Sequence, residues 1–437
     1  MLDADTVLGL TRNHESRAVN TFRMGLSPPV FVRGEGAWLF EESGAAWLDF
    51  VCGSSTSNLG HGYPPHIEAI REVVSSGILH TGTRLPSPYR AGLYQSLCRI
   101  MPEGLDCIHL GNSGAEAIET AIKVAQHATG RSRLMAFEGG YHGRTLGALS
   151  LSSGMRIRDS FSLLESNVDI LPYPYPEDPA GEGFRDEVCS AKLSERLDQL
   201  DRAGDLPAAV FIEAVQGVGG VLEPRGKFLA DARELTSRYG VLLVCDEIWS
   251  GFGRAGKWFS FERSGIIPDI IAMGKAVSGG LPLSATAASS KVLKSWGPGM
   301  HTSTFQGNPL SCATADATVR AIGEGRLLDY VSEIVEPMLR EAFHRLELME
   351  RIHAVRVIGA QAAIEFLDRQ GKPGMNEAVR VQKAALEQKI LIYSGGRNGN
   401  AAMIVPPINI DRDDLAMGLA QVRKLIEREA TRGAQDD

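Results

Sequence analysis

The stretch VLLVCDEIWSGFGRAGKWFSFERSGIIPDIIAMGK, residues 241–275, decides the fold class of this chain. It contains two short apolar runs, VLLVCD at 241–246 and DIIAM at 269–273, which do not alternate apolar and polar residues. Such runs are typical of strands buried on both faces of a mainly parallel sheet. Asp246 closes the first run and Lys275 follows the second by two positions, so both side chains are expected at strand ends.

Earlier segments extend this pattern. The runs CIHL, RLMAF and AAVFIE, at 107–110, 133–137 and 208–213, are further strand candidates separated by helical stretches. Residues 114–129 carry apolar side chains at helical spacing and are followed by Gly130, which predicts an amphipathic helix that stops there. The pattern predicts an α/β fold whose large domain has a mainly parallel sheet flanked by helices.

The length of 437 residues exceeds the usual size of one hydrophobic core, so at least one smaller domain is expected. Residues 37–51 alternate around a turn and predict a hairpin. The C-terminal stretch mixes charged helices with the strand candidates AAIEF and AAMIVPP. We predict an N-terminal segment at 1–60 that joins the small domain, a large domain at 61–310, and a smaller α+β domain at 311–437.

The composition excludes several classes of protein. A net charge of -8 argues against a nucleic-acid or anionic-membrane partner. No apolar run approaches the roughly 20 residues of a membrane span, and the acidic start MLDADTVLGL lacks the basic region of a signal peptide. The six cysteines form no CxxC pair or metal spacing, so we expect buried, reduced thiols, no metal and a cytoplasmic location.

Asp246 and Lys275 are the first candidates for chemistry, because ligands of open α/β sheets bind at the carboxyl ends of strands. They could form a structural ion pair between neighbouring strand ends, or they could hold a cofactor between them. A carboxylate keeps a nearby ring nitrogen protonated. A desolvated lysine has a lowered pKa that suits it to form a Schiff base.

Two glycine-containing loops add to this picture. Residues 111–115, Gly-Asn-Ser-Gly-Ala, precede a predicted helix, where backbone N–H groups can bind a phosphate or simply make a strand–helix turn. In the loop at 138–145, Tyr141 stands among glycines and either covers a flat ring or packs in a tight turn. A lysine, an acid, a phosphate cradle and a stacking group are together the parts that pyridoxal 5′-phosphate (PLP) requires.

The chain resembles the class III aminotransferases, also called ω-aminotransferases, which have the PLP-dependent fold type I. The resemblance extends from about residue 25 to 425. It is carried by the strings GNSGAEAIETAIKVA (111–125), GGYHGRT (139–145), FIEAVQGVGG (211–220), CDEIWSGFGRAGKWFSFE (245–262), PDIIAMGKAVSGGLPLSA (268–285) and TFQGNP (304–309).

This resemblance implies roles for residues around the cofactor ring. Lys275 would form the Schiff base and Asp246 would pair with the pyridine nitrogen. Ile248 would pack on one face of the ring, and Tyr141, with His142 close by, on the other.

It also implies how the rest of the cofactor is held. Ser113, Gly114 and Ala115 would bind the phosphate, and Glu213 would sit beside the acid at the ring nitrogen. Thr304 would reach the phosphate of the partner subunit, so the resemblance implies a homodimer with its active site at the subunit interface.

The sequence departs from the family at the substrate. Many members carry an Arg in a segment resembling GNVIRFLPPL, which grips the α-carboxylate of glutamate or 2-oxoglutarate, and an acid in a loop resembling EPVQGEGG, which neutralises that Arg. Here Met403 and Val218 stand at these positions. Arg397 and Arg144 are the remaining candidates for a substrate carboxylate, and Trp249 either narrows the pocket or packs.

Two functions remain open on these grounds. The first is an aminotransferase that moves an amino group between an amine, amino sugar or amino acid and an oxo acceptor through Lys275. The alternative is an amino acid or lactam racemase or epimerase of the same family, which has no need of the Arg–acid switch. A non-catalytic PLP-binding protein would lack the lysine or carry a DNA-binding appendage, and the sequence shows neither.

Overall fold

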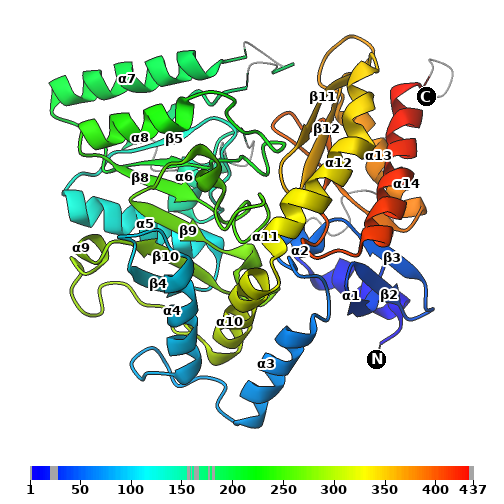
Figure 1. Ribbon diagram of the computed structural model, residues 1–437, viewed down its shortest axis with the longest axis horizontal. Coiled ribbons are helices and arrows are strands. Elements are labelled where there is room, and N and C mark those ends of the chain that lie inside the picture. Colours follow the sequence, from blue (N-terminus) through cyan, green and yellow to red (C-terminus); the bar gives the residue numbers. More distant parts are fainter. Residues whose placement is uncertain are drawn as a thin grey trace.

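The computed structural model describes residues 2–19, 28–154, 158, 160–161, 167–175, 178–179 and 183–432. Its centre is a seven-stranded sheet (Figure 1). Across the sheet the strands are β4 (Cys107–Gly111), β10 (Ser284–Ala288), β9 (Ile270–Met273), β8 (Leu242–Asp246), β7 (Ala209–Ile212), β5 (Leu134–Phe137) and β6 (Val168–Leu171). Only β10 runs antiparallel to its neighbours, which confirms the predicted mainly parallel sheet and the five predicted strands.

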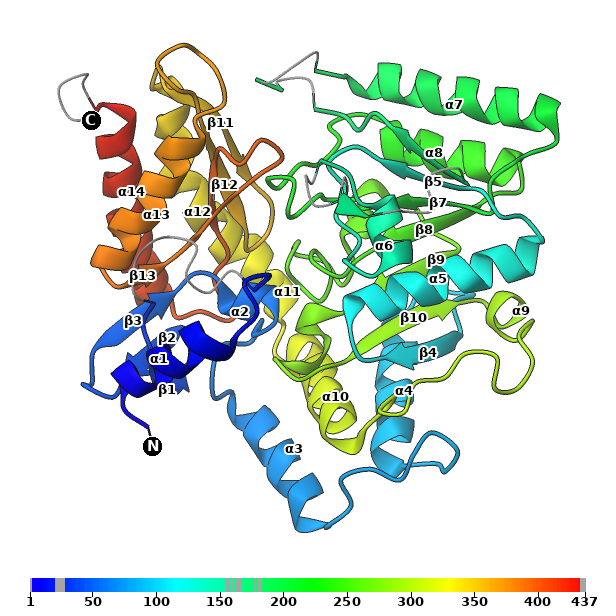
Figure 2. The same ribbon diagram turned by 180° about the vertical axis from the view of Figure 1, so that it is seen from behind.

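Both faces of this sheet are buried, which explains why its strands are apolar without alternation. In β8 the side chains of Leu243 and Cys245 join one apolar cluster, whereas Val244 between them joins another on the opposite face. The helices α7 (Asp186–Ala203) and α8 (Phe228–Arg238) contribute to the first cluster and α5 (Gly114–Thr129) to the second. Figure 2 shows α5 in front of the sheet, with α7 and α8 at the top of the view.

Two four-stranded sheets form the rest of the core. One is built from β1 (Phe31–Glu35), β2 (Trp38–Glu41), β3 (Ala46–Asp49) and β13 (Ile390–Leu391); the other, in order, from β11 (Ile352–Val357), β12 (Ala362–Phe366), β15 (Ala401–Ile404) and β14 (Tyr393–Gly395). The antiparallel pair β2–β3 is the predicted hairpin, and β3 pairs in parallel with β13. The N-terminal segment therefore shares a sheet with a strand from the far end of the chain.

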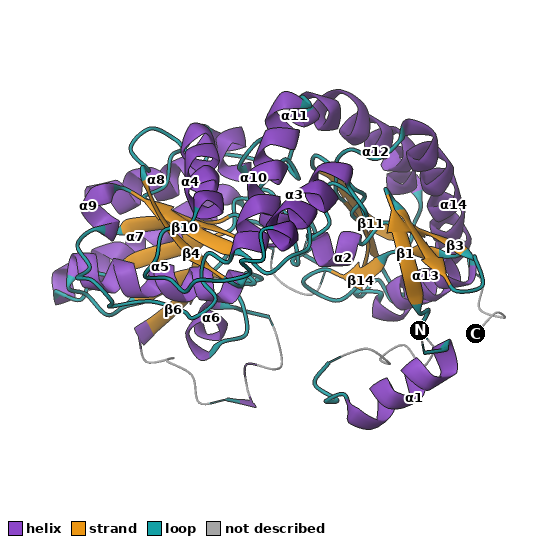
Figure 3. Ribbon diagram, turned by 90° about the horizontal axis from the view of Figure 1, so that it is seen from below, coloured by secondary structure: helices purple, strands orange, loops and turns teal. Residues whose placement is uncertain are grey.

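Helices connect and cover these sheets. Figure 3 shows the seven-stranded sheet on one side and the smaller sheets on the other, with α3 (Pro64–Ser75) and α10 (Pro309–Glu324) between them. The α-helices not yet described are α1 (Ala4–His14), α2 (Cys52–Ser55), α4 (Pro88–Ile100), α6 (Leu146–Leu151), α9 (Ser290–Leu293), α11 (Leu327–Tyr330), α12 (Glu336–Phe343), α13 (Met375–Glu387) and α14 (Arg412–Ala430).

The six cysteines are all free. Four are buried as predicted, but Cys107 is partly exposed and the prediction is wrong for Cys98, which is exposed. Helix α4 buries Leu93 and Leu97 on one side, and the next position along the helix turns Cys98 toward solvent. Among the described helices none has the length and apolar character to cross a bilayer, and the described residues include no cluster of three or more potential metal ligands.

Candidate active site

Asp246 is the centre of the site, at the carboxyl end of β8. Its side chain is only 3% exposed. The Oδ1 atom accepts a hydrogen bond from the Ile248 backbone at 2.9 Å, and Oδ2 lies 2.8 Å from Nδ1 of His142. The carboxylate is thus held in a fixed orientation by the next turn of its own loop and by a buried histidine.

His142 and Glu213 complete this charged group. Burial alone would lower the pKa of His142, but the hydrogen bond to Asp246 and the charges of Asp246 and Glu213 raise it overall. Burial, and next the nearby charge of Asp246, raise the pKa of Glu213 to about 7. Glu213 accepts a hydrogen bond from the Tyr141 backbone at 2.8 Å. It therefore fixes the loop that carries Tyr141 and His142 to the end of β7.

Lys275 enters this group from the neighbouring strand β9, with Gly274 between them. Its backbone has φ = 44°, in the left-handed region that non-glycine residues seldom adopt. Burial lowers the pKa of its amine, although the charges of Asp246 and Glu213 oppose that shift. The Nζ atom lies 4.5 Å from the ring centroid of Trp249 and 6.0 Å from that of Tyr141. The amine is therefore bounded by two aromatic rings.

The start of α5 meets the same strand ends. Ser113 caps the helix by accepting a hydrogen bond from the Glu116 backbone at 3.3 Å. A Cβ atom on Gly114 would come within 2.9 Å of Ile248 Cγ2, and one on Gly274 within 3.2 Å of the Gly114 Cα. Glycine at these positions lets the backbones of three loops approach closely, with the free N–H groups of the first helical turn beside them.

An apolar wall lies beside Lys275. Trp249 and Met403 belong to one buried cluster, and Val218 packs against it. Met403 lies on β15, where it pairs with Ala363 of β12 and Tyr393 of β14. The two departures from the family pattern, Met403 and Val218, thus come together at the apolar cluster that contains Trp249, the ring beside the lysine.

The remaining predicted residues lie farther out. Arg144 is exposed. Arg397 is paired: its Nη2 atom lies 2.5 Å from Glu138 Oε2, and its Nε atom lies 3.9 Å from Asp178 Oδ2. Thr304 is exposed, and its backbone carbonyl accepts a hydrogen bond from His80 Nε2 at 2.6 Å. Thr304, Arg144 and the helix cap Ser113 are therefore the exposed members of the predicted set.

Comparison with known proteins assigns this arrangement to a family. The family model described as "Aminotransferase class-III" matches residues 24–426. The chain belongs to the class III aminotransferases. It is 35% identical over 403 residues to a diaminobutyrate–2-oxoglutarate aminotransferase of Haemophilus influenzae, an alignment that covers 89% of this chain and 88% of that protein.

Other class III relatives agree. The chain is 34% identical to an acetylornithine aminotransferase of Methanopyrus kandleri, with 90% of this chain and 93% of that protein covered. The crystal structure of an (S)-enantioselective ω-transaminase from Thermomicrobium roseum superposes with a TM-score of 0.88 at 27% identity, covering 99% and 100% of the two chains. The protein is a class III aminotransferase of fold type I.

The sequence did not single out three residues that this class III site contains. Gln361 bonds to Trp249, Gly217 lies beneath the same ring, and Glu138 pairs with Arg397. Glu138 was visible only as the first residue of a glycine-containing loop and Gly217 only as one position of the string FIEAVQGVGG, and Gln361 gave no signal by spacing or type. Their partners lie far away in the sequence, so local patterns could not reveal them.

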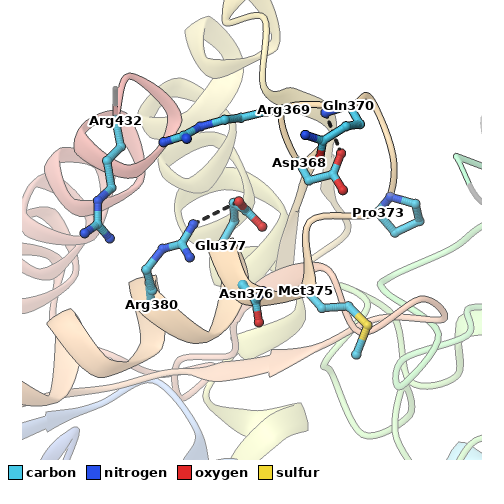
Figure 4. Close-up of a pocket in the computed structure, with 9 residues that line it drawn as sticks. All are labelled: Asp368, Arg369, Gln370, Pro373, Met375, Asn376, Glu377, Arg380 and Arg432. Carbon is cyan, nitrogen blue, oxygen red and sulfur yellow. Dashed lines mark hydrogen bonds and ion pairs between the residues drawn. The ribbon is translucent and has the colours of Figure 1, made fainter. Parts of the chain in front are cut away.

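A separate hollow of about 770 Å³ lies near the start of α13 and the end of α14 (Figure 4). It is lined by Asp368, Arg369, Gln370, Pro373, Met375, Asn376, Glu377, Arg380 and Arg432. Glu377 pairs with Arg380 at 2.9 Å, and Arg380 also pairs with Glu429 at 2.6 Å. The hollow contains none of the predicted site residues, so it is distinct from the site at Lys275.

Proposed function

We propose that this aminotransferase carries PLP covalently on Lys275 and transfers an amino group from a primary amine to an oxo acceptor. The observation that carries the proposal is the meeting of three features at neighbouring strand ends. These are a half-buried lysine whose amine has a lowered pKa, the buried Asp246–His142 pair, and the glycine-lined start of α5.

The residues fit such a cofactor. Ser113, Gly114 and Ala115 would hold its phosphate at the helix start. Ile248 and Tyr141 would cover the two faces of its ring. Ile248 lies beside Gly274, the residue before the lysine, and the Tyr141 ring lies 6.0 Å from the lysine amine. When bound, PLP supplies an electron sink that stabilises negative charge on the carbon next to the substrate amine.

The chain's own groups would do the rest. Asp246, oriented by His142 and by the Ile248 backbone, would hold a positive charge at the ring nitrogen. Glu213 would keep that acid and the Tyr141 loop in place. Burial lowers the pKa of the Lys275 amine. Its Nζ atom would therefore accept the proton from the substrate carbon and pass it to a carbon of the cofactor.

The substrate preference follows from the apolar wall. Relatives of this chain are aminotransferases of diaminobutyrate and acetylornithine, which supports an amino compound as donor. A carboxylate that enters beside Met403 and Val218 loses hydration without gaining a cation. We therefore propose that 2-oxoglutarate is a poor acceptor, and that the exposed Arg144 receives the substrate carboxylate more readily than Arg397, which would first have to leave Glu138.

Three further assignments remain proposals. An active site shared across a homodimer is supported by the exposed position of Thr304, which is free to meet a partner subunit. A cytoplasmic location is supported by six free cysteines. Division into 1–60, 61–310 and 311–437 is supported by the pairing of β3 with β13.

Borohydride reduction of the protein purified with its cofactor tests the proposal. We expect loss of the visible absorption band and a pyridoxyl group fixed on Lys275, as mapped by peptide mass spectrometry. Lys275→Arg should show neither the absorption band nor the pyridoxyl group. Lys291 is an exposed lysine on α9, and Lys291→Arg, which should behave like the natural protein, serves as the control. A pyridoxyl group on another lysine would refute the assignment.

A second assay separates transamination from racemisation. Substrate alone in deuterated water should stop after one half-reaction with a stoichiometric amount of oxo product. Continued exchange of the α-proton with loss of optical purity, and no oxo product, would instead identify a racemase.

A further inference from the structure

The hollow in Figure 4 gathers cationic side chains from three parts of the C-terminal region. Arg369 follows β12, Arg380 lies on α13, and Arg432 follows the end of α14. Figure 4 shows their side chains around the same space. A second hollow of about 640 Å³ shares Arg380 and Arg432 with the first and adds Lys383 and Arg428 to the lining. The whole chain has a net charge of -8, so a cluster of cations is a local feature of this surface.

Two buried carboxylates hold the arginines together without matching their charge. Glu377 Oε1 lies 2.6 Å from Arg351 Nη2 and 2.9 Å from Arg380 Nη2. Glu429 Oε1 lies 2.6 Å from Arg380 Nη2, and Glu429 Oε2 lies 3.8 Å from Arg432 Nη1. Each glutamate side chain is only 8% exposed. Three guanidinium groups therefore share two carboxylates.

The other acids in the two linings do not restore the balance. Asp368 Oδ1 accepts hydrogen bonds from the backbone N–H groups of Gln370 and Lys372 at 2.8 and 2.9 Å, and Glu387 is exposed. With Arg351 included, six cationic side chains surround four carboxylates. Like charges gathered in one place repel one another, and a bound anion would relieve that repulsion.

The arrangement of the arginines suits a phosphate better than a carboxylate. A carboxylate has two acceptor oxygens in one plane, and a single guanidinium fork satisfies both. A phosphate group carries about two negative charges near neutral pH and three acceptor oxygens that point in different directions. The lining also includes the amides of Gln370 and Asn376 and the exposed Met375, and a hollow of about 770 Å³ has room for an organic group attached to the phosphate.

We propose that this hollow is an anion-binding site for a phosphate-bearing small molecule, held by Arg369, Arg380 and Arg432. Glu377 and Glu429 keep Arg380 in place for this role. The hollow contains no residue of the site at Lys275, so the inference goes beyond the proposed transamination and does not depend on it.

Isothermal titration with inorganic pyrophosphate tests the site. The protein is first loaded with its cofactor and reduced with borohydride, so that the cofactor's own phosphate site cannot take up the probe. We expect one saturable site per chain with a dissociation constant below about 1 mM. Added NaCl should weaken this binding, because exposed charges are screened by salt.

Two variants locate the binding. Arg369→Gln and Arg432→Gln should each weaken it about tenfold or more, since each removes a charge-assisted hydrogen bond. Arg380 is kept, because its loss would leave two buried carboxylates without that cation and should destabilise the fold. Arg412 is exposed at the opposite end of α14 from Arg432. Arg412→Gln, with the same loss of charge, is the matched control and should bind pyrophosphate like the natural protein.

Labelling with phenylglyoxal, which modifies accessible arginines, gives a second readout. Pyrophosphate should slow the labelling of Arg369 and Arg432 severalfold without protecting Arg412, as measured by peptide mass spectrometry. No saturable binding, a variant at Arg369 or Arg432 that binds as tightly as the natural protein, or equal protection of all three arginines would overturn the proposal. A pyridoxyl group on another lysine would defeat the proposed function instead, and the comparison of arginine variants would be unaffected by it.

Discussion

Replacing Asp246 by Asn tests the electrostatic centre of the site, because it keeps the shape of the side chain and removes its charge. In the natural protein the buried His142 lies 2.8 Å from Asp246 Oδ2, and this contact raises the pKa of His142 in spite of burial. Asn can still accept the hydrogen bond from the Ile248 backbone. The fold should therefore persist, while the charged form of His142 loses the negative charge of Asp246 that stabilises it.

The magnitude follows from the kind of bond that is lost. A hydrogen bond to a charged partner contributes about 1.5–3 kcal/mol, and a pKa unit corresponds to about 1.4 kcal/mol. Losing this bond should destabilise the charged imidazolium by about 1.5–3 kcal/mol, so the pKa of His142 should fall from above the ordinary value of 6.5 to below it.

The sign of the stability effect is then fixed. Because the pKa of His142 is raised in the folded protein, its interaction with Asp246 stabilises the fold fully below pH 6.5 and is lost as the pH rises through the folded value. The difference in stability between the natural protein and Asp246→Asn should be largest near pH 5.5 and smallest near pH 8.5.

Histidine ¹³Cε1 resonances of the cofactor-free protein give the measurement, with His142→Gln to identify the signal. Asp269→Asn is the control, since Asp269 bonds to Arg233 and to the Leu243 backbone and not to His142. The loaded Asp246→Asn enzyme should also lose on the order of 100-fold or more in turnover. An unchanged His142 titration, or near-normal turnover, would show that the reasoning is mistaken.

Three further expectations follow from the site. Because the raised pKa of Glu213 favours the protonated acid, the natural protein should lose about 3 kcal/mol of stability as the pH rises from about 4.5 to about 7. Glu213→Gln should not show this loss. Thermal unfolding across pH measures it, and equal pH profiles for both proteins would contradict it. If Thr304 binds the cofactor phosphate in the site of the partner subunit, the protein should sediment as a homodimer at micromolar concentration and lose PLP on dissociation. A fully active monomer would exclude this role. The double variant Met403→Arg, Val218→Glu should improve the use of 2-oxoglutarate. Met403→Arg alone buries an unpaired charge and should lower the yield of folded protein. If the natural enzyme is strongly active with 2-oxoglutarate and stays so without Arg397, the apolar wall is not a barrier.

Local sequence was sufficient for five strands of the large sheet and for the neighbouring positions of Asp246 and Lys275. Strands buried on both faces need apolar side chains at every position, so runs such as 242–246 and 270–273 stand out without any knowledge of their neighbours. Asp246 ends one such run and Lys275 follows another by two positions, and parallel strands place their carboxyl ends at one edge. Their meeting could therefore be predicted from the order of elements along the chain.

The substrate side could not be predicted in this way, because it is made by contacts between distant segments. Trp249 and Gln361 are separated by 112 positions, and Arg397 and Glu138 by 259. The sequence showed that Met403 and Val218 are apolar, but only the packing of the C-terminal sheet against the loops of the seven-stranded sheet brought both to the apolar cluster that contains Trp249. Side-chain hydrogen bonds and ion pairs of this kind depend on the relative positions of whole sheets. Those positions are set by the burial of apolar surface between the sheets, and not by the local conformational preference of either residue in the pair.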